Sequence, residues 1–206
     1  TQKIEYICKG EAEEVYEPYF TFHGFRYVHV VSFPGEPKVE NFSGISLSSD
    51  LPKTGEFECS NASINKLYEN ILWTQKNNYL DIPTDCPQRE RSGWTGDAQV
   101  FTSTACFNLD VMPFLSKWLQ DVIFEQRADG RIAGIAPNTF KFSKNPLAQA
   151  TEGSSGFGDA AVIIPWTLYQ FYGDKSLLER QYESMKKWVE YERNEAKTTH
   201  WRRIIN

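Results

Sequence analysis

The sequence predicts a mostly α-helical protein that begins with a β-rich segment. Between Tyr16 and Phe57, aromatic and β-branched residues alternate with polar ones, which is the two-residue period of strands. From Ser60 onward, apolar residues recur at the three-to-four-residue spacing of amphipathic helices. This change of period divides the chain into a short β part and a longer helical part.

The β part contains short predicted strands separated by turn signals. The stretch YFTFHGFRYVHVVSF is interrupted at His23-Gly24, which predicts a hairpin or a bulge, and further turns follow at Pro34-Gly35 and at residues 52–55. So few strands do not make a stable sheet with two covered faces. We therefore expect this part to be the end of a β-domain whose beginning lies upstream of Thr1.

The helical part contains at least five predicted helices. Ser60 or Asn61 is a suitable N-cap for the first. The others are predicted from near Gly96 to Phe107, from just after Asp110, from about Asp159 to Tyr172, and from Lys175 to about Glu192. Helices in successive antiparallel hairpins predict a bundle or an α/α toroid. Residues 129–157 lack a period and are too long for a simple connection, which is typical of a functional loop. Residues 196–206 show neither a cap nor a period.

Composition argues against several classes of function. The net charge of −5, without basic residues interleaved with aromatic ones, argues against nucleic-acid binding. No apolar run approaches the roughly 18 residues of a membrane helix. The four cysteines form no CxxC pair, which argues against a zinc site. Their even number permits two disulfides, but the loose spacing favours free buried thiols, which leave the cellular compartment open. Aromatic residues make up 15% of the chain, more than a plain core needs, and sugar sites use such faces for stacking.

Residues 85–99, DCPQRERSGWTGDAQ, are the candidate site. Carboxylates, arginines and a Trp in one loop are what a pocket for a polar, ring-shaped ligand requires. Gly93 and Gly96 are predicted to allow sharp turns, and Trp94 between them to supply a stacking surface. Cys86 is interpreted as structural. The alternative is a solvated salt-bridge network, with Asp97 acting only as a charge at a helix N-terminus.

Glycoside hydrolysis uses two carboxyl groups, one of which must carry a proton at neutral pH. Glu90 lies between Arg89 and Arg91, whose charges favour its ionised form. If Glu90 is a general acid, the arginines must point away from it, or a neighbouring carboxylate must favour its protonated form.

At these residues the sequence resembles the bacterial α-L-rhamnosidases, glycoside hydrolase family 78. The resemblance is carried by DIPTDCPQRERSGWTGDAQVF, by FTFHGFRYVHV, by DGRIAGIAPN and by GFGDAAVIIPWTLYQFYGD, and it extends from about Tyr16 to Glu192. It implies that residues 1–57 are the C-terminal part of a β-sandwich domain. Residues 58–206 would be the N-terminal part of an (α/α)6 toroid, incomplete in this chain.

The resemblance also implies an activity and a set of site residues. The activity is inverting hydrolysis of terminal non-reducing α-L-rhamnosyl residues from glycosides or polysaccharides, without a metal or organic cofactor. Glu90 would be the general acid. Asp85, Arg89 and Asp97 would hold the rhamnose hydroxyls, and Trp94 would pack against the sugar. Phe157 stands where the family commonly has a Trp, so it keeps an apolar wall but lacks the indole N–H.

The general base is expected to be a Glu well beyond residue 206. Because half a toroid leaves its inner helix faces uncovered, we expect this chain to be a fragment, either poorly stable or dimeric, with little turnover of its own. Two other classes stay open: a carbohydrate-binding module without catalysis, and an interaction fragment whose acidic cluster is a solvated face. Other α/α-toroid glycosidases are rivals within the enzyme class, since the residues alone do not distinguish rhamnose from another sugar ring.

Overall fold

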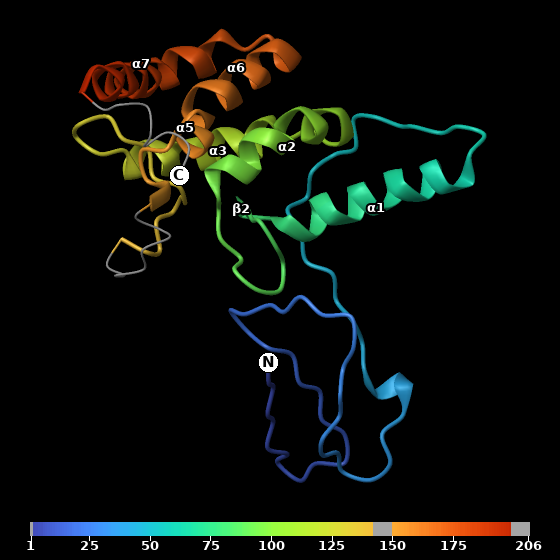
Figure 1. Cartoon of the computed structure of the whole chain (residues 1–206). Coiled ribbons are helices and arrows are strands. Elements are labelled where there is room, and N and C mark those ends of the chain that lie inside the picture. The colour runs from blue at the N-terminus through green and yellow to red at the C-terminus, as the bar shows by residue number, and fades with distance from the viewer. Residues whose placement is uncertain (1, 142–149, 199–206) are drawn as a thin grey trace.

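In the computed structural model, which describes residues 2–141 and 150–198, a helical body carries an extended N-terminal segment, residues 2–57 (Figure 1). The helices are α1 (Ala62–Asn78), α2 (Thr95–Asn108), α3 (Met112–Glu125), α5 (Ser155–Gly158), α6 (Ala160–Tyr172) and α7 (Lys175–Thr198). A 3-10 turn, η1 (Val39–Asn41), lies in the N-terminal segment, and β1 (Tyr79–Leu80) pairs antiparallel with β2 (Ile82–Pro83). No helix among the described residues is long and apolar enough to cross a membrane.

The helix predictions are confirmed with small shifts of the ends. Asn61 caps α1, because its Oδ1 accepts the backbone N–H groups of Ser63 and Ile64 at 2.9 and 3.3 Å. Gly173 ends α6 in the left-handed region, with φ 69°. The last helix continues to Thr198, so its predicted end near Glu192 is wrong. Residues 199–206 lie outside the described residues.

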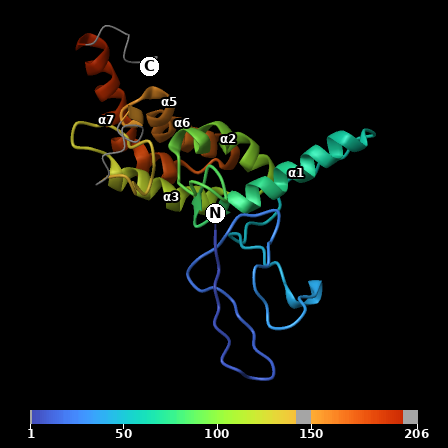
Figure 2. The ribbon, with the colours of Figure 1, turned by 60° about the horizontal axis from the view of Figure 1, so that its bottom comes forward.

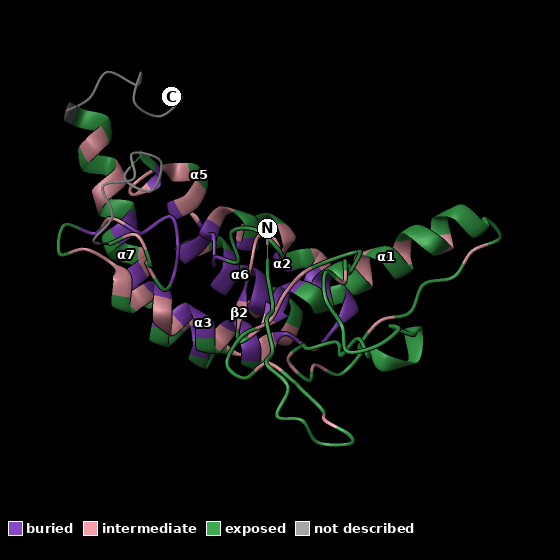
Figure 3. Cartoon of the chain, turned by 90° about the horizontal axis from the view of Figure 1, so that it is seen from below, coloured by how far each residue is buried: buried purple, intermediate pink, exposed green. Residues whose placement is uncertain are grey.

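The core lies where α2, α3, α6 and α7 meet (Figure 3). The apolar stripe predicted on α3 is buried, and Trp118 at its centre has no exposed surface. The indole Nε1 of Trp118 donates to the carbonyl of Ala136 at 2.8 Å. This bond fixes the following loop, residues 129–141, to the body.

Helix α1 joins this body only near its C-terminal end and projects from it (Figure 2). Gln75 is buried there, and it accepts a hydrogen bond from the Asn108 amide at 3.0 Å. Ile64 and Leu67, part of the predicted apolar face, remain exposed. The periodicity of α1 therefore predicts the helix correctly without identifying what covers it.

The strands predicted between Tyr16 and Phe57 are not confirmed. Residues 2–57 contain no β-strand, only an isolated bridge between Lys53 and Leu109. Alternation favours extended backbone, but a strand also requires a neighbour for its ladder hydrogen bonds. In the described segment, most backbone runs extended and exposed without such a neighbour.

Candidate active site

The site loop, residues 84–94, connects β2 to α2 and closes on itself. The Asp85 N–H donates to the Ser92 carbonyl at 3.1 Å, and the Ser92 N–H donates to Asp85 Oδ1 at 3.0 Å. At its C-terminal end, Ala136 N–H donates to the Gly93 carbonyl at 2.9 Å. The base of the loop is thus held by the body, while residues 86–91 form its tip.

The predicted role of the two glycines is wrong. Neither Gly93 nor Gly96 has a positive φ; the left-handed residue of the loop is Arg91, with φ 53°. A Cβ at Gly93 would collide with the Ala136 carbonyl, and one at Gly96 would lie 2.9 Å from the carbonyl oxygen of Gly156. The glycines therefore allow close packing, not turns.

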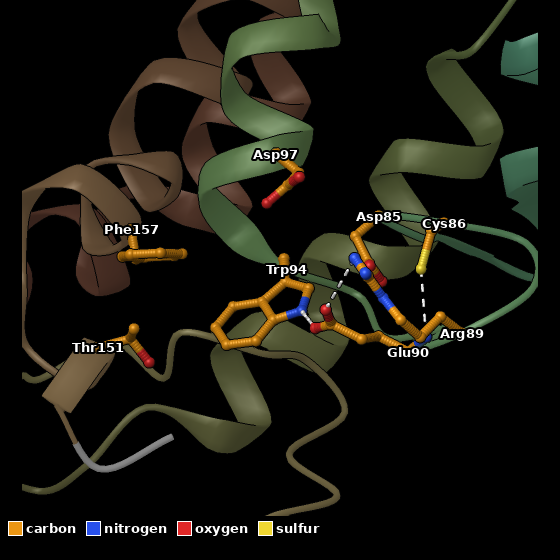
Figure 4. Close-up of a pocket in the computed structure, with 8 residues that line it drawn as sticks. All are labelled: Asp85, Cys86, Arg89, Glu90, Trp94, Asp97, Thr151 and Phe157. Carbon is orange, nitrogen blue, oxygen red and sulfur yellow. Dashed lines mark hydrogen bonds and ion pairs between the residues drawn. The ribbon is translucent and has the colours of Figure 1, made fainter. Parts of the chain in front are cut away.

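All six predicted site residues line one open cavity of about 390 Å³ (Figure 4). The lining residues are Asp85, Cys86, Arg89, Glu90, Trp94, Asp97, Thr151 and Phe157. Ligand pockets span roughly 300–1,000 Å³, so this volume suits a small polar ligand. The polar groups converge on this space from the site loop, the start of α2 and residues 150–158.

Glu90 is held at the cavity by three contacts (Figure 4). Trp94 Nε1 donates to Glu90 Oε2 at 3.0 Å, and Arg89 Nη2 lies 3.5 Å from Oε1. The backbone N–H of Glu90 donates to Cys86 Sγ at 3.1 Å. Arg91 turns away, and its Nη1 donates to the Phe22 carbonyl at 2.9 Å. Of the two flanking arginines, only Arg89 forms an ion pair with this carboxylate.

Asp97 lies in the first turn of α2, above the ring of Trp94 (Figure 4). Although its side chain is open to solvent, partial burial against the pocket wall raises the pKa of its carboxyl. The negative charges of Asp85 and Glu90 raise this pKa further. The cavity therefore has a negative field, which favours ligands that offer hydrogen-bond donors such as sugar hydroxyls.

An aromatic wall closes one side of the cavity. Trp94 is only 8% exposed, and its ring lies 5.5 Å from that of Phe157 at an angle of 50°. Because its indole N–H donates to Glu90, Trp94 holds the Glu90 carboxylate in place as well as forming part of the wall. The sequence does not predict that bond. Glu90 and Trp94 are four residues apart, and in a loop this spacing does not determine whether two side chains point toward each other.

Sequence reasoning missed Cys86 and Thr151 as lining residues. Cys86 lies inside the motif but was interpreted as structural, and its contact with the Glu90 N–H is indeed a structural one. Thr151 lies in the loop that was predicted to be functional, without a signal that singled it out. It is anchored by its neighbours, because Glu152 forms an ion pair with Arg127 and the Gly153 N–H donates to the Ile132 carbonyl at 3.0 Å.

The four cysteines are free, as predicted, but only Cys106 is buried, so the prediction of buried thiols is wrong for the other three. Within residues 2–141 and 150–198, no group of three or more His, Cys, Asp or Glu side chains is arranged to hold a metal ion.

Residues 52–206 match the bacterial alpha-L-rhamnosidase 6 hairpin glycosidase domain, and residues 1–48 match the bacterial alpha-L-rhamnosidase concanavalin-like domain. An alpha-L-rhamnosidase from Streptomyces avermitilis is 44% identical over 187 residues, which cover 90% of this chain and 17% of that protein. One from Formosa agariphila is 42% identical over 195 residues, 93% of this chain and 20% of that protein. The chain thus spans about a fifth of the length of these relatives.

Solved structures give the same result. The Streptomyces avermitilis alpha-L-rhamnosidase complexed with L-rhamnose superposes with a TM-score of 0.82 at 44% identity, over 89% of this chain and 17% of that one. The alpha-L-rhamnosidase from Dictyoglumus thermophilum gives a TM-score of 0.80 at 42% identity, over 88% of this chain and 20% of that one.

Proposed function

The chain belongs to the bacterial α-L-rhamnosidases, and from this membership we propose that the protein hydrolyses terminal non-reducing α-L-rhamnosyl residues of glycosides or polysaccharides. One observation carries the proposal: the Glu90 carboxylate, fixed by the Trp94 N–H, lies in the same cavity as Asp85, Arg89 and Asp97. A carboxyl group beside groups that can bind sugar hydroxyls is the arrangement that glycoside hydrolysis requires.

In the proposed mechanism, Glu90 is the general acid. It gives its proton to the glycosidic oxygen as the bond from that oxygen to the anomeric carbon breaks. A water molecule attacks the anomeric carbon from the opposite face, and a second carboxylate takes the proton of that water. The product then has inverted configuration, and the two carboxyl groups must lie about 6.5–9.5 Å apart to admit the water. We expect this base to be a Glu beyond residue 206.

The ion pair with Arg89 must be released before Glu90 carries a proton. This contact is long, at 3.5 Å, and the Arg89 side chain is 78% exposed, so little holds it in place. We propose that the Arg89 guanidinium exchanges its contact with Glu90 for hydrogen bonds to the sugar hydroxyls, which Asp85 and Asp97 also bind. Binding of the substrate would then free the acid.

The apolar wall would receive the less polar face of the sugar. Trp94 and Phe157 supply this wall from the site loop and from α5. A 6-deoxy sugar carries a methyl group that needs such a surface. The phenyl ring of Phe157, smaller than an indole, supplies apolar surface but no hydrogen-bond donor.

We further propose that residues 1–57 belong to a β-sandwich domain and residues 58–206 to the (α/α)6 catalytic domain. The separate family matches, to residues 1–48 and 52–206, support this division.

The first experiment follows an aryl α-L-rhamnoside by proton NMR, with the 206-residue chain and with the complete gene product in parallel. We expect β-rhamnose as the first product, released by the complete gene product, and little or no release by the 206-residue chain. Initial release of α-rhamnose would contradict inversion. Binding of rhamnose without release by either protein would favour the alternative, a carbohydrate-binding module.

The second experiment tests the acid. Glu90→Gln in the complete gene product removes the proton and keeps the shape, so turnover of substrates with poor leaving groups should fall by about 10²–10⁴-fold. The affinity for rhamnose should change little. An unchanged rate on such a substrate would reject the assignment of Glu90.

A further inference from the structure

We propose that Arg91 is a positioning residue that orients Glu90 by tying the tip of the site loop to residues 22–24 of the N-terminal segment. The inference rests on the proposed role of Glu90 as the general acid. Arg91 directly follows the acid in the sequence, and in this proposal it does not contact the substrate.

Two interactions join Arg91 to Phe22. Its Nη1 donates to the Phe22 carbonyl at 2.9 Å, and its guanidinium carbon lies 5.6 Å from the centre of the Phe22 ring. A planar guanidinium over an aromatic face is a favourable cation–π arrangement. The backbone of Arg91 is left-handed, with φ 53°, which is unfavourable for a residue with a Cβ. A conformation of this kind persists only when its surroundings hold it in place.

A second contact holds the other side of the tip. Gly24 packs so closely against the loop that a Cβ there would lie 2.6 Å from the carbonyl oxygen of Pro87. Gln2 Nε2 also donates to the Gln88 carbonyl at 3.0 Å. Residues 22–24 are half-buried, while most of the surrounding segment is exposed. The N-terminal segment therefore touches the site loop on both sides of Glu90.

Glu90 lies between these contacts and the body. The body holds the base of the loop through Asp85 and Ser92 and holds the carboxylate through Trp94. The left-handed turn at Arg91 is thus held from two directions, because Ser92 is bonded to Asp85 on the side of the body and the Arg91 side chain is bonded to Phe22 on the side of the N-terminal segment. If the turn relaxes, the backbone of Glu90 rotates and its carboxyl is no longer aimed at the leaving oxygen, while the sugar contacts of Asp97 and Phe157 are undisturbed.

The test uses the dependence of rate on the leaving group, measured in the complete gene product. An activated aryl rhamnoside needs little protonation, whereas an alkyl rhamnoside depends on the acid. For Arg91→Ala we expect kcat on the alkyl substrate to fall by about tenfold or more, within the range that acid catalysis contributes. The activated substrate should lose less than about threefold, and inhibition by free L-rhamnose should be unchanged.

Matched variants separate this effect from loss of structure. Arg91→Lys keeps one donor and should recover part of the rate on the alkyl substrate. Gly24→Ala places a methyl group against the Pro87 carbonyl and so separates the segment from the tip of the loop. It should give the same selective loss of rate on the alkyl substrate. Arg26→Ala and Gly44→Ala are the controls, because Arg26 is exposed and a Cβ at Gly44 would meet nothing within 4 Å.

Equal losses on both substrates, or no loss, would overturn the role of Arg91. If Arg91→Ala does not fold, Arg91→Lys and Gly24→Ala decide by the same criterion. Glu90→Gln, measured alongside, distinguishes the two proposals. A selective loss in Glu90→Gln without one in the Arg91 and Gly24 variants rejects only the inference, whereas no selective loss in Glu90→Gln rejects the acid itself.

Discussion

The helical body and the N-terminal segment are both rich in aromatic residues, but among the described residues only the body buries any of them. In the body, Trp118 and Trp188 have no exposed surface. In the segment, Tyr27 is 87% exposed and Tyr19 is 82% exposed. The comparison teaches that an aromatic residue becomes core only where a second element packs on it. Periodicity predicts an apolar face, but not the element that covers it.

The candidate site lies at the meeting point of these two regions. Its base is held by the core, through Gly93 and the loop after α3, and its tip is held by residues 22–24. A rigid side and a lightly held side thus meet at Glu90. If this difference is real, substitutions in the body should change stability strongly, and substitutions in the segment should change it little.

The largest expected effect is on the core. Trp118→Ala opens a cavity and leaves the Ala136 carbonyl without its donor, so it should lower the free energy of unfolding by about 3–5 kcal/mol. Tyr27→Ala should change it by less than about 0.5 kcal/mol, because that ring is exposed. Urea unfolding followed by far-ultraviolet circular dichroism measures both. Similar losses in the two variants would mean that the segment is part of the cooperative core.

A glycine pair tests the same contrast by adding atoms. Gly158 lies against the buried ring of Trp188, and a Cβ there would collide with that ring. Gly158→Ala should therefore cost about 1–3 kcal/mol from overpacking, despite the better helix propensity of Ala. Gly44→Ala has open space and should be nearly neutral. Thermal melts of both variants provide the measurement, and a stabilised Gly158→Ala would show that the Trp188 pocket is loosely packed.

The sequence predicted the positions of the helices better than their partners. Asn61 as N-cap, the buried stripe centred on Trp118 and the turn at Gly173 are local features, which a few neighbouring residues specify. The strands before Phe57 require partners that alternation does not specify, and the structure assigns none in that region. Local patterns predict elements, whereas pairing and coverage depend on distant residues.

The same limit applies to the site. The motif accounts for five of the six expected cavity residues, because four come from the site loop and Asp97 follows closely on α2. The sixth, Phe157, was expected from a separate segment of the resemblance. Thr151 and Phe22 are beyond that reach, since they arrive from segments that lie dozens of residues away. Arg91 was the misleading residue: its position beside Glu90 suggested a charge effect, but its left-handed backbone directs it to Phe22.

A smaller effect is expected at the junction itself. Trp94→Phe keeps an aromatic wall but removes the N–H that donates to Glu90. A hydrogen bond to a neutral group such as the protonated acid contributes about 0.5–1.5 kcal/mol to its positioning, so kcat on substrates with poor leaving groups should fall by about threefold to tenfold. Trp166→Phe, at a half-exposed position on α6, is the matched control. If both variants keep the normal rate, the bond from Trp94 does not position the acid.

Two carboxyl groups, one in each region, should respond to pH with opposite signs. Because the pKa of Asp97 is raised, the folded state binds more protons than the unfolded state just above pH 3.8. The stability that Asp97 contributes is thus complete at low pH and is lost as pH rises. Asp97→Asn should gain stability relative to the parent between pH 4 and pH 7, by less than about 1 kcal/mol because solvent screens this side chain. Urea midpoints at the two pH values test this, and a gain that does not change with pH would contradict it.

Glu14, in the N-terminal segment, gives the opposite and most local effect. The backbone N–H of Lys9 and the hydroxyl of Tyr6, together with further backbone N–H groups, lower the pKa of Glu14 to about 2. The order that Glu14 gives to residues 6–14 should therefore be complete above pH 4.5 and disappear as pH falls toward 2. NMR titration of the Glu14 carboxyl carbon and the Lys9 amide should give one shared midpoint near pH 2, and Glu14→Gln should abolish the amide transition. A midpoint near 4.5 would mean that these bonds do not persist in solution, and that Glu14 does not order residues 6–14.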